Sequence, residues 1–228
     1  MPFNEVRRVR DLVPIRNVIV SVSDKRELSV LAAGLVAACP GVRIHSTGGT
    51  YSLLRSTLAV AGPEAERALV AMSDYTGQPE MQGGLVKTLD WKIYLGLLAE
   101  EGNAAHEADL ARHGAVAFDL VVASLYPFGE ALAAGAGAEE LRQHVDIGGP
   151  AMLRAAAKNH LRVGAVSSPD QYSALLSELR ATGGRLSFAT RVSLAADAFR
   201  LVADYDEAIA RWMEGRAGSD AARAYDLA

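Results

Sequence analysis

Short β-branched runs alternate with helical segments along this chain of 228 residues, and this alternation is what most limits its fold. Residues 17–22 (NVIVSV) are typical of a buried strand, because the run is apolar and β-branched with no helical stripe. A helix to about residue 38, a Pro40-Gly41 stop and a second strand at 42–46 follow. Strands joined by helices form parallel sheets covered on both faces. The sequence therefore predicts an α/β fold built on a parallel sheet.

The rest of the chain continues this pattern. Asp24 with Glu27 three positions later predicts the start of the first helix. Further strands are predicted at 68–72, 119–124 and 162–167, and further helices at 103–113, 138–144, 150–160, 171–181 and 188–213. Residues 133–137 are expected to form a loop of small residues rather than a linker between domains. We expect one domain over residues 1–228, with 1–15 and 214–228 as terminal extensions.

Composition excludes several classes of protein. A formal net charge of -4 argues against a general nucleic-acid binder, which needs Lys and Arg to neutralise phosphates. The single cysteine, Cys39, forms no internal disulfide and is expected to be a buried apolar side chain. The charged N-terminus does not fit a signal peptide, and no apolar run approaches the roughly 20 residues of a membrane span. We therefore expect a cytoplasmic protein with no membrane partner.

Two turns that leave predicted strands have the composition of a phosphate site. Backbone N–H groups at a helix N-terminus, opened by glycine and flanked by hydroxyls, bind anions. The candidates are Ser46, Thr47, Gly48 and Gly49 in one turn, and Ser21, Ser23 and Lys25 in the other. Both turns fall at the carboxyl edge of a parallel sheet, where ligands usually bind. Either turn alone also fits a plain loop, and neither matches a P-loop or dinucleotide motif.

Two side chains in other segments are candidates for charge stabilisation. Lys87 lies in a glycine-rich apolar stretch, where desolvation strengthens the effect of an ammonium group. Tyr126 directly follows the strand predicted at 119–124, where a phenol can donate to developing negative charge. From these segments alone, a solvated lysine and an aromatic core residue are open alternatives.

A fourth segment starts at Asp146 and leads through two glycines into a helix. Gly148 and Gly149 permit close approach of a ligand to the helix start. Arg154 and Lys158 are four residues apart and share one face of that helix. The alternative is an N-capping aspartate followed by two exposed cations.

Taken together, these segments resemble the inosine-monophosphate cyclohydrolase domain of the bifunctional purine transformylase/cyclohydrolase family. The matching stretches are SVSDK (21–25), STGGT (46–50), SDYTG (73–77), PEM (79–81), VKTL (86–89), LYPF (125–128), DIGG (146–149) and RAAAKNH (154–160). They cover most of residues 17–212 in the expected order. The resemblance implies a methylglyoxal-synthase-like, Rossmann-like α/β fold.

The resemblance also implies roles for single residues. Lys87, Tyr126, Asp146 and Lys158 match the catalytic set of the family, with Asp146 held by Lys158. The phosphate pocket is matched by Ser21, Ser23, Lys25, Ser46, Thr47, Gly48 and Gly49. Thr88, Ile147 and Gly148 match positions that line the heterocyclic base of the nucleotide in the family, and Ser124 is expected to face the same base. A formylamino group and a carboxamide then condense with loss of water, which needs no metal or organic cofactor.

Several positions depart from the family pattern. Leu85 stands in place of an arginine, Asp90-Trp91 in place of His-Pro, Tyr94-Leu95 in place of a histidine and a small residue, and Ser124 in place of an asparagine. Losing the arginine removes a fixed charge and five donors beside Lys87. This pattern keeps the chemical residues, alters the recognition residues and favours a changed substrate.

Three hypotheses about function follow. The first is a stand-alone cyclohydrolase that yields inosine monophosphate, with a homodimeric state implied by the resemblance and a separate formyltransferase upstream. The second is the same ring closure on a related heterocycle, such as a pyrazole C-nucleotide in nucleoside antibiotic biosynthesis. The third is a purine nucleotide-binding module without turnover. A methylglyoxal-synthase-like activity is disfavoured, because only the fold and the phosphate turn resemble that enzyme.

Overall fold

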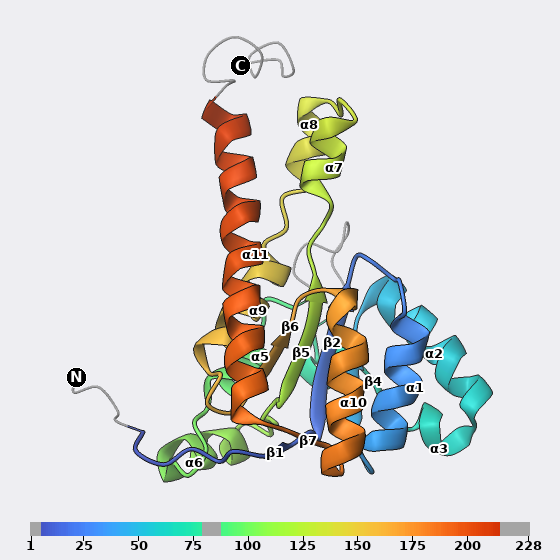
Figure 1. Ribbon diagram of the computed structural model, residues 1–228, viewed down its shortest axis with the longest axis vertical. Coiled ribbons are helices and arrows are strands. Elements are labelled where there is room, and N and C mark those ends of the chain that lie inside the picture. The colour runs from blue at the N-terminus through green and yellow to red at the C-terminus, as the bar shows by residue number, and fades with distance from the viewer. Residues whose placement is uncertain (1–5, 79–87, 215–228) are drawn as a thin grey trace.

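Five parallel strands form the centre of the computed structural model, which describes residues 6–78 and 88–214 (Figure 1). Their order across the sheet is β4-β3-β2-β5-β6, and every neighbouring pair is parallel. The strands are β2 (Asn17–Val22), β3 (Arg43–Ser46), β4 (Leu69–Ala71), β5 (Leu120–Ser124) and β6 (Gly164–Val166). The chain runs from β2 outward to β4 and then crosses back to β5. The neighbours β2 and β5 therefore form the topological switch point of the sheet.

Helices cover both faces of this sheet. Alternate residues of β2 point to opposite faces: Val18 and Val20 join one buried cluster and Ile19 joins another. The first cluster is completed by α1 (Leu28–Ala38), α2 (Gly48–Ala61) and α10 (Tyr172–Thr182), and the second by α5 (Trp91–Leu98), α9 (Gly148–Lys158) and α11 (Phe188–Glu214). The predicted α/β architecture with a parallel sheet is confirmed.

Within the predicted extension 1–15, residues 10–14 make contacts with the rest of the fold. β1 (Val13–Pro14) pairs antiparallel with β7 (Arg185–Leu186). The guanidinium of Arg191 is fully buried and donates to five backbone carbonyls, those of Arg10, Asp11, His160, Leu161 and Leu186. A buried guanidinium needs all of its donors satisfied. Arg191 thereby joins the N-terminal segment, the end of α9 and the start of α11.

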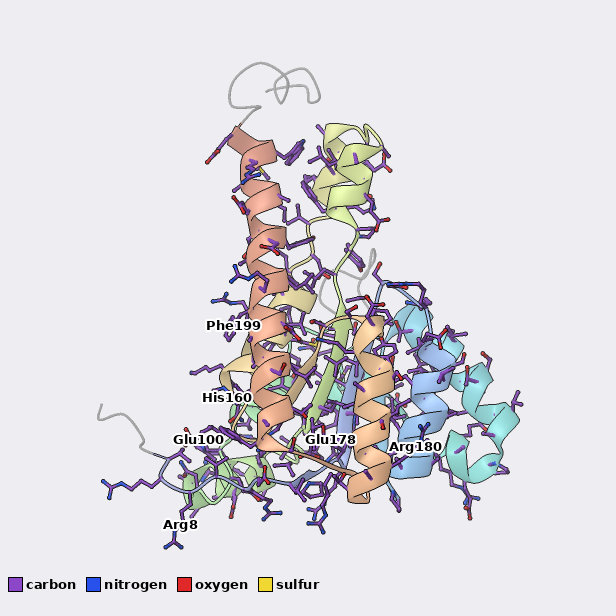
Figure 2. All side chains as sticks on the ribbon, viewed as in Figure 1. Arg8, Glu100, His160, Glu178, Arg180 and Phe199 are labelled. Carbon is purple, nitrogen blue, oxygen red and sulfur yellow. The ribbon has the colours of Figure 1, made fainter. Side chains whose placement is uncertain are left out.

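The long helix α11 extends past the sheet, and two short helices stand beside its outer half (Figure 1). These are α7 (Phe128–Ala133) and α8 (Ala138–Gln143), which together we call the lobe. The ring of Phe128 packs edge to face on Tyr205 and Trp212 of α11. At the other end of α11, the carboxylate of Glu178 accepts from Ser187 and Thr190 and lies between α10 and α11 (Figure 2). α11 is therefore fixed at one end and supports the lobe with the other.

Several predicted boundaries are displaced at turns that become part of the site. Helix α1 begins at Leu28 instead of near Asp24, because the Asp24 carboxylate accepts the N–H of Arg26 and holds these residues in a turn. Helix α2 begins at Gly48 and α9 at Gly148, so the predicted Gly-Gly turns are the first turns of helices. The strand predicted at 162–167 narrows to β6, and the one at 68–72 to β4.

Other helices were predicted well or missed because they are short. The helix predicted at 103–113 is α6 (Ala104–Arg112), capped by the Asn103 side chain. The remaining short helices are α3 (Pro63–Glu66), α4 (Met72–Thr76) and the 3-10 turn η2 (Pro169–Gln171). The sequence analysis missed α5 and α7, which have eight and six residues. Among the described residues, no helix combines the length and the apolar character that crossing a bilayer requires.

Candidate active site

A cavity of about 380 Å³ lies at the carboxyl ends of β2 and β5, at the switch point of the sheet. Its walls come from the loops after β2, β3 and β5, from the segment that precedes α5, and from the residues between α8 and α9. The carboxyl ends of the strands point toward the lobe, and the wall between α8 and α9 begins where the lobe ends (Figure 1). Ligands of open α/β sheets bind at this position.

One end of the cavity, which we call the amide end, is formed by the first turn of α2 and the loop after β2. Gly48 has φ +51°, a conformation that favours glycine, and a Cβ on Gly49 would meet nothing within 4 Å. The first N–H groups of a helix have no partner within the helix. Among the described residues, the Thr47 side chain makes no capping hydrogen bond to them. These donors are therefore open to an anionic ligand.

Lys25 adds a cation to the amide end. Its ammonium donates to the carbonyl of Val22 and, at 3.0 Å, to the hydroxyl of Thr50. Desolvation lowers the pKa of Lys25, although the nearby Asp24 carboxylate opposes this change. The Thr50 hydroxyl also donates to the Val22 carbonyl at 3.0 Å. Lys25 and Thr50 thus join the loop after β2 to the start of α2.

Ser124, the last residue of β5, fixes the same loop from the other side. Its hydroxyl oxygen accepts the N–H groups of Ser23 and Asp24 at 2.8 and 2.9 Å. The sequence analysis placed Ser124 beside the base. The structure places it in the cavity wall with its hydroxyl on the loop of the amide end. Both acceptor positions of the oxygen are used, and its proton is left for another partner.

Another part of the cavity lining, which we call the carboxylate end, is centred on Asp146. One oxygen of its carboxylate accepts the N–H of Gly149 at 2.9 Å. Burial raises the pKa of Asp146, and hydrogen bonds from the N–H groups of Gly149, Tyr126 and Gly148 oppose that rise. A Cβ on Gly149 would lie 2.6 Å from the other carboxylate oxygen. Gly149 therefore has to be glycine for the carboxylate to lie where it does.

Tyr126, Ile147 and Thr88 complete the carboxylate end. Tyr126 is 47% exposed and Ile147 is 60% exposed, and both line the cavity. Thr88 is buried, and a Cβ on Gly148 would come within 2.6 Å of its hydroxyl oxygen. The absence of a Cβ on Gly148 thus allows α9 to begin directly against Thr88. The cavity has one end rich in N–H and hydroxyl donors, and another with a phenol and a half-buried carboxylate.

Most of the predicted site residues meet in this cavity. Those that line it are Ser21, Ser23, Lys25, Thr47, Gly48, Gly49, Thr88, Ser124, Tyr126, Asp146, Ile147 and Gly148. Lys87 and the substituted Leu85 lie outside the described residues. The cavity brings together turns that lie between residues 21 and 149 of the sequence, as the order of the parallel strands requires.

Two residues that the sequence placed in the site, Ser46 and Lys158, do not line this cavity. Ser46 is 1% exposed, and its hydroxyl donates to the carbonyl of Val20 at 2.7 Å, so it bridges two strands beneath the cavity. Lys158 is exposed at the last residue of α9, ten residues beyond Gly148. At 1.5 Å per residue, this separation along the helix axis is roughly 15 Å. Asp146 is therefore held by backbone N–H groups and not by Lys158.

The comparisons with known proteins agree with this geometry. A model of the AICARFT/IMPCHase bienzyme family matches residues 156–227. The bifunctional purine biosynthesis protein PurH of Dinoroseobacter shibae is 46% identical over 203 residues, which are 89% of this chain and 36% of that protein. PurH of Mycobacterium ulcerans is 45% identical over 214 residues, 94% of this chain and 38% of that protein. A crystal structure of ForH superposes with a TM-score of 0.69 at 37% identity, covering 86% of this chain and 97% of that one.

The chain belongs to the PurH-related AICARFT/IMPCHase family. It spans little more than a third of the length of the curated relatives, and its extent matches that of ForH. The resemblance inferred from the sequence is thereby confirmed, together with the methylglyoxal-synthase-like fold. The chain corresponds to a PurH-like cyclohydrolase domain.

The family departures differ in how close they lie to the cavity. Trp91 is 58% exposed and packs edge to face on His113 at 4.8 Å between ring centroids. Asp90 caps α5 by accepting the N–H of Lys92. Of the departures within the described residues, Ser124 is the one whose side chain lines the cavity.

The sequence analysis also missed several residues of the site. Val22, Thr50, Leu89, Gln143 and Val145 line the cavity as well, and so does Gly149, which the sequence had marked only for close approach of a ligand. Val22, Thr50 and Leu89 lie inside motifs that were singled out, so their neighbours were the available signal. Gln143 ends α8, Val145 follows that helix, and neither belongs to a motif that was singled out. Only the packing of the lobe brings them to the cavity.

Proposed function

We propose that this member of the AICARFT/IMPCHase family is a cyclohydrolase that closes a six-membered ring on a formylamino-carboxamide heterocycle ribonucleotide by loss of water. The observation that carries the proposal is the composition of one cavity lining. It combines a helix N-terminus whose first N–H groups suit an anion with a phenol and a carboxylate. A nucleoside monophosphate has one group for each of these: a phosphate for the N–H donors and a heterocyclic ring for the phenol and the carboxylate.

The reaction needs a nucleophile held against an electrophile. The carboxamide nitrogen attacks the formyl carbon, a new C–N bond forms, and the formyl oxygen becomes an oxyanion. In this proposal Asp146 accepts the proton of the amide and Tyr126 donates to the oxyanion, which is supported by the presence of both side chains in the cavity lining. The oxyanion takes up the proton removed from the amide; in the elimination the C–O bond breaks with a second proton delivered to the oxygen, the formylamino nitrogen loses its own proton, a C=N bond forms and one water leaves. The resemblance assigns a share of the oxyanion stabilisation to Lys87. The largest contribution comes from holding the two groups together, because the amide nitrogen is a weak nucleophile.

We propose further that the substrate is a heterocycle related to the imidazole of purine synthesis, such as a pyrazole C-nucleotide in a nucleoside antibiotic pathway. Two features support this choice. ForH, a solved chain of matching extent, is similar over 97% of its length. Ser124 replaces the expected asparagine within the cavity wall, and Leu85 replaces an arginine beside Lys87. The altered positions fit a changed ring better than a lost reaction.

The second candidate is the imidazole substrate itself, which would yield inosine monophosphate. The higher identity with PurH proteins, 45–46% against 37% with ForH, favours it. In either case we expect a homodimer and a separate formyltransferase that supplies the substrate.

The test is a product analysis with two substrates side by side. The purified chain is incubated with the formylated imidazole and the formylated pyrazole carboxamide ribonucleotides, and products are identified by chromatography and mass. We expect loss of one water from the pyrazole substrate, with a higher kcat/KM than for the imidazole. A preference for the imidazole would select the second candidate. Tight binding of inosine monophosphate with no turnover of either substrate would make the chain a binding module.

A further inference from the structure

The backbone of the Asp146 segment is held by a side chain from a distant part of the chain. The phenol oxygen of Tyr205, on α11, accepts the N–H of Asp146 at 2.8 Å and donates to the carbonyl of His144 at 2.6 Å. One hydroxyl thus bridges two backbone groups on either side of Val145. Tyr205 lies 59 residues after Asp146 in the sequence, and no motif of the sequence analysis includes it.

The helix that carries Tyr205 is well suited to fix its position. Val202 is one turn earlier on α11 and is buried in the core, so Tyr205 lies on the inward face of the helix. Arg191, further back, is fixed by five backbone carbonyls. Beyond the sheet, the Tyr205 ring packs edge to face on Phe128 of the lobe, with 6.2 Å between ring centroids. Because α11 is packed in the core, Tyr205 fixes the backbone of the cavity wall relative to the core.

The hydroxyl of Tyr205 keeps its proton over the working range of a cytoplasmic enzyme. Burial raises the pKa of Tyr205 to about 12, so the group remains both a donor and an acceptor. Both hydrogen bonds are needed at once, because the segment between α8 and α9 has no regular structure of its own. Without the bridge, the His144 carbonyl and the Asp146 N–H would each need another partner.

We propose that Tyr205 is a positioning residue, which holds the Asp146 carboxylate at the carboxylate end of the cavity by clamping the backbone of residues 144–146. The inference rests on the proposed function for its kinetic consequence, but the clamp itself can be tested without turnover. It gives α11 a role in the site although α11 contributes no residue to the cavity lining.

The test compares Tyr205→Phe with a matched control, Tyr75→Phe. Tyr75 is also a half-buried phenol that accepts one backbone N–H, from Val116 at 3.1 Å, but it does not line the cavity. Each variant keeps its ring and loses one oxygen. We expect Tyr205→Phe to lower kcat by about 10-fold to 100-fold with KM within about 2-fold, because a misplaced reacting group costs rate more than binding. Tyr75→Phe should change both constants by less than about 2-fold.

Amide hydrogen exchange supplies the readout that is independent of turnover. In the wild-type protein, the Asp146 amide should be protected, and Tyr205→Phe should speed exchange in residues 143–147 alone. Tyr75→Phe should instead speed exchange around Val116. Wild-type kcat in Tyr205→Phe, or unchanged exchange at Asp146, would overturn the inference. If the wild type turns over no substrate, the proposed function fails while exchange still decides on the clamp. If Tyr205→Phe does not fold, the wild type alone decides: fast exchange of its Asp146 amide would overturn the proposed role of Tyr205, and protection of that amide from exchange would support it.

Discussion

The amide end of the cavity is made by residues that directly follow two adjacent strands, whereas the carboxylate end collects residues from three separate stretches. At the amide end, the groups are backbone N–H donors and short hydroxyls; Lys25 ties the loop after β2 to the start of α2, and Ser124 ties the same loop to β5. At the carboxylate end, Asp146 depends on two glycines and on Tyr205 of α11. The comparison teaches that sheet topology brings together the residues of the proposed anion site, while the proposed reacting groups depend on long-range packing. It also predicts that changes at the amide end act on binding and changes at the carboxylate end act on rate.

The largest effect is expected at Asp146. Asp146→Asn keeps an oxygen that can accept the Gly149 N–H but removes the base, and general bases typically contribute 10²- to 10⁴-fold. We expect kcat to fall by at least about 100-fold, with the affinity for the product nucleotide within about 3-fold. Steady-state kinetics and calorimetric titration measure the two quantities. A variant that turns over at the wild-type rate would remove Asp146 from the mechanism.

The same residue sets a dependence on pH. The base acts in its charged form, and burial raises its pKa above the ordinary value of 3.8. We therefore expect kcat/KM to fall about tenfold per pH unit on the acid side of a midpoint above 3.8. Since the folded-state pKa is raised, the charged carboxylate destabilises the fold, and this cost is relieved as the pH falls through the raised pKa. Asp146→Asn should thus unfold at a temperature no lower than the wild type at pH 7, and a marked drop would contradict this sign.

The next effect is expected at Gly149. A Cβ there meets the Asp146 carboxylate at 2.6 Å and Leu125 at 2.8 Å, so Gly149→Ala displaces the carboxylate. We expect kcat to fall about 10-fold or more and the free energy of unfolding to fall by about 1–3 kcal/mol. The matched control is Gly129→Ala in α7, where a Cβ meets nothing within 4 Å. That variant should keep its rate and unfold at the same or a slightly higher temperature.

The amide end should respond differently. Lys25→Met removes a cation that contacts Thr50 and Val22, and we expect KM to rise about 10-fold with kcat within about 2-fold. The neighbouring Arg26 pairs with Asp24 at the surface and offers a control, because Arg26→Met should leave KM nearly unchanged. A kcat that falls as far as KM rises in Lys25→Met would break the division between the two ends.

The smallest effect is expected at Ser124, which borders both ends. Ser124→Ala removes the acceptor of two loop N–H groups, and we expect KM to rise about 3-fold, because water can replace the hydroxyl in this open wall. Ser124→Thr keeps the oxygen and should restore the wild-type KM. Kinetics of the pair with one substrate distinguish a lost hydrogen bond from a change of volume. An unchanged KM in Ser124→Ala would show that the loop needs no such tie.

The contrast between the two ends also explains what the sequence could predict. Strand β2 and the motifs around Thr47 and Asp146 carry local signals, namely β-branched runs, glycine pairs and hydroxyls, and these led to the sheet and to most of the cavity. The sequence could not show that the Ser46 hydroxyl bonds to the Val20 carbonyl, because a place in a motif does not tell which way a side chain points. Nor could it show the distance of Lys158 from Asp146, because ten helical residues separate Lys158 from the helix start.

Long-range contacts account for the rest. Tyr205 and Arg191 act through hydrogen bonds to backbone groups. Every residue has such a backbone group, so the sequence of the partner segment does not show that it is bonded. The lobe was not predicted to form a wall of the site, because α7 is short and begins beside Pro127. Strand β1, which lies within the predicted N-terminal extension, was missed because a strand of two residues is too short to show a periodic pattern in the sequence.

The account depends most on a nucleotide lying in this cavity with its phosphate at the amide end and its ring at the carboxylate end. A crystal structure of the wild-type protein with inosine monophosphate bound tests this arrangement directly. We predict phosphate oxygens within about 3 Å of the N–H groups of Gly48 and Gly49, and the base against Tyr126 and Asp146. A nucleotide bound in the reverse direction, or bound outside the cavity, would contradict it.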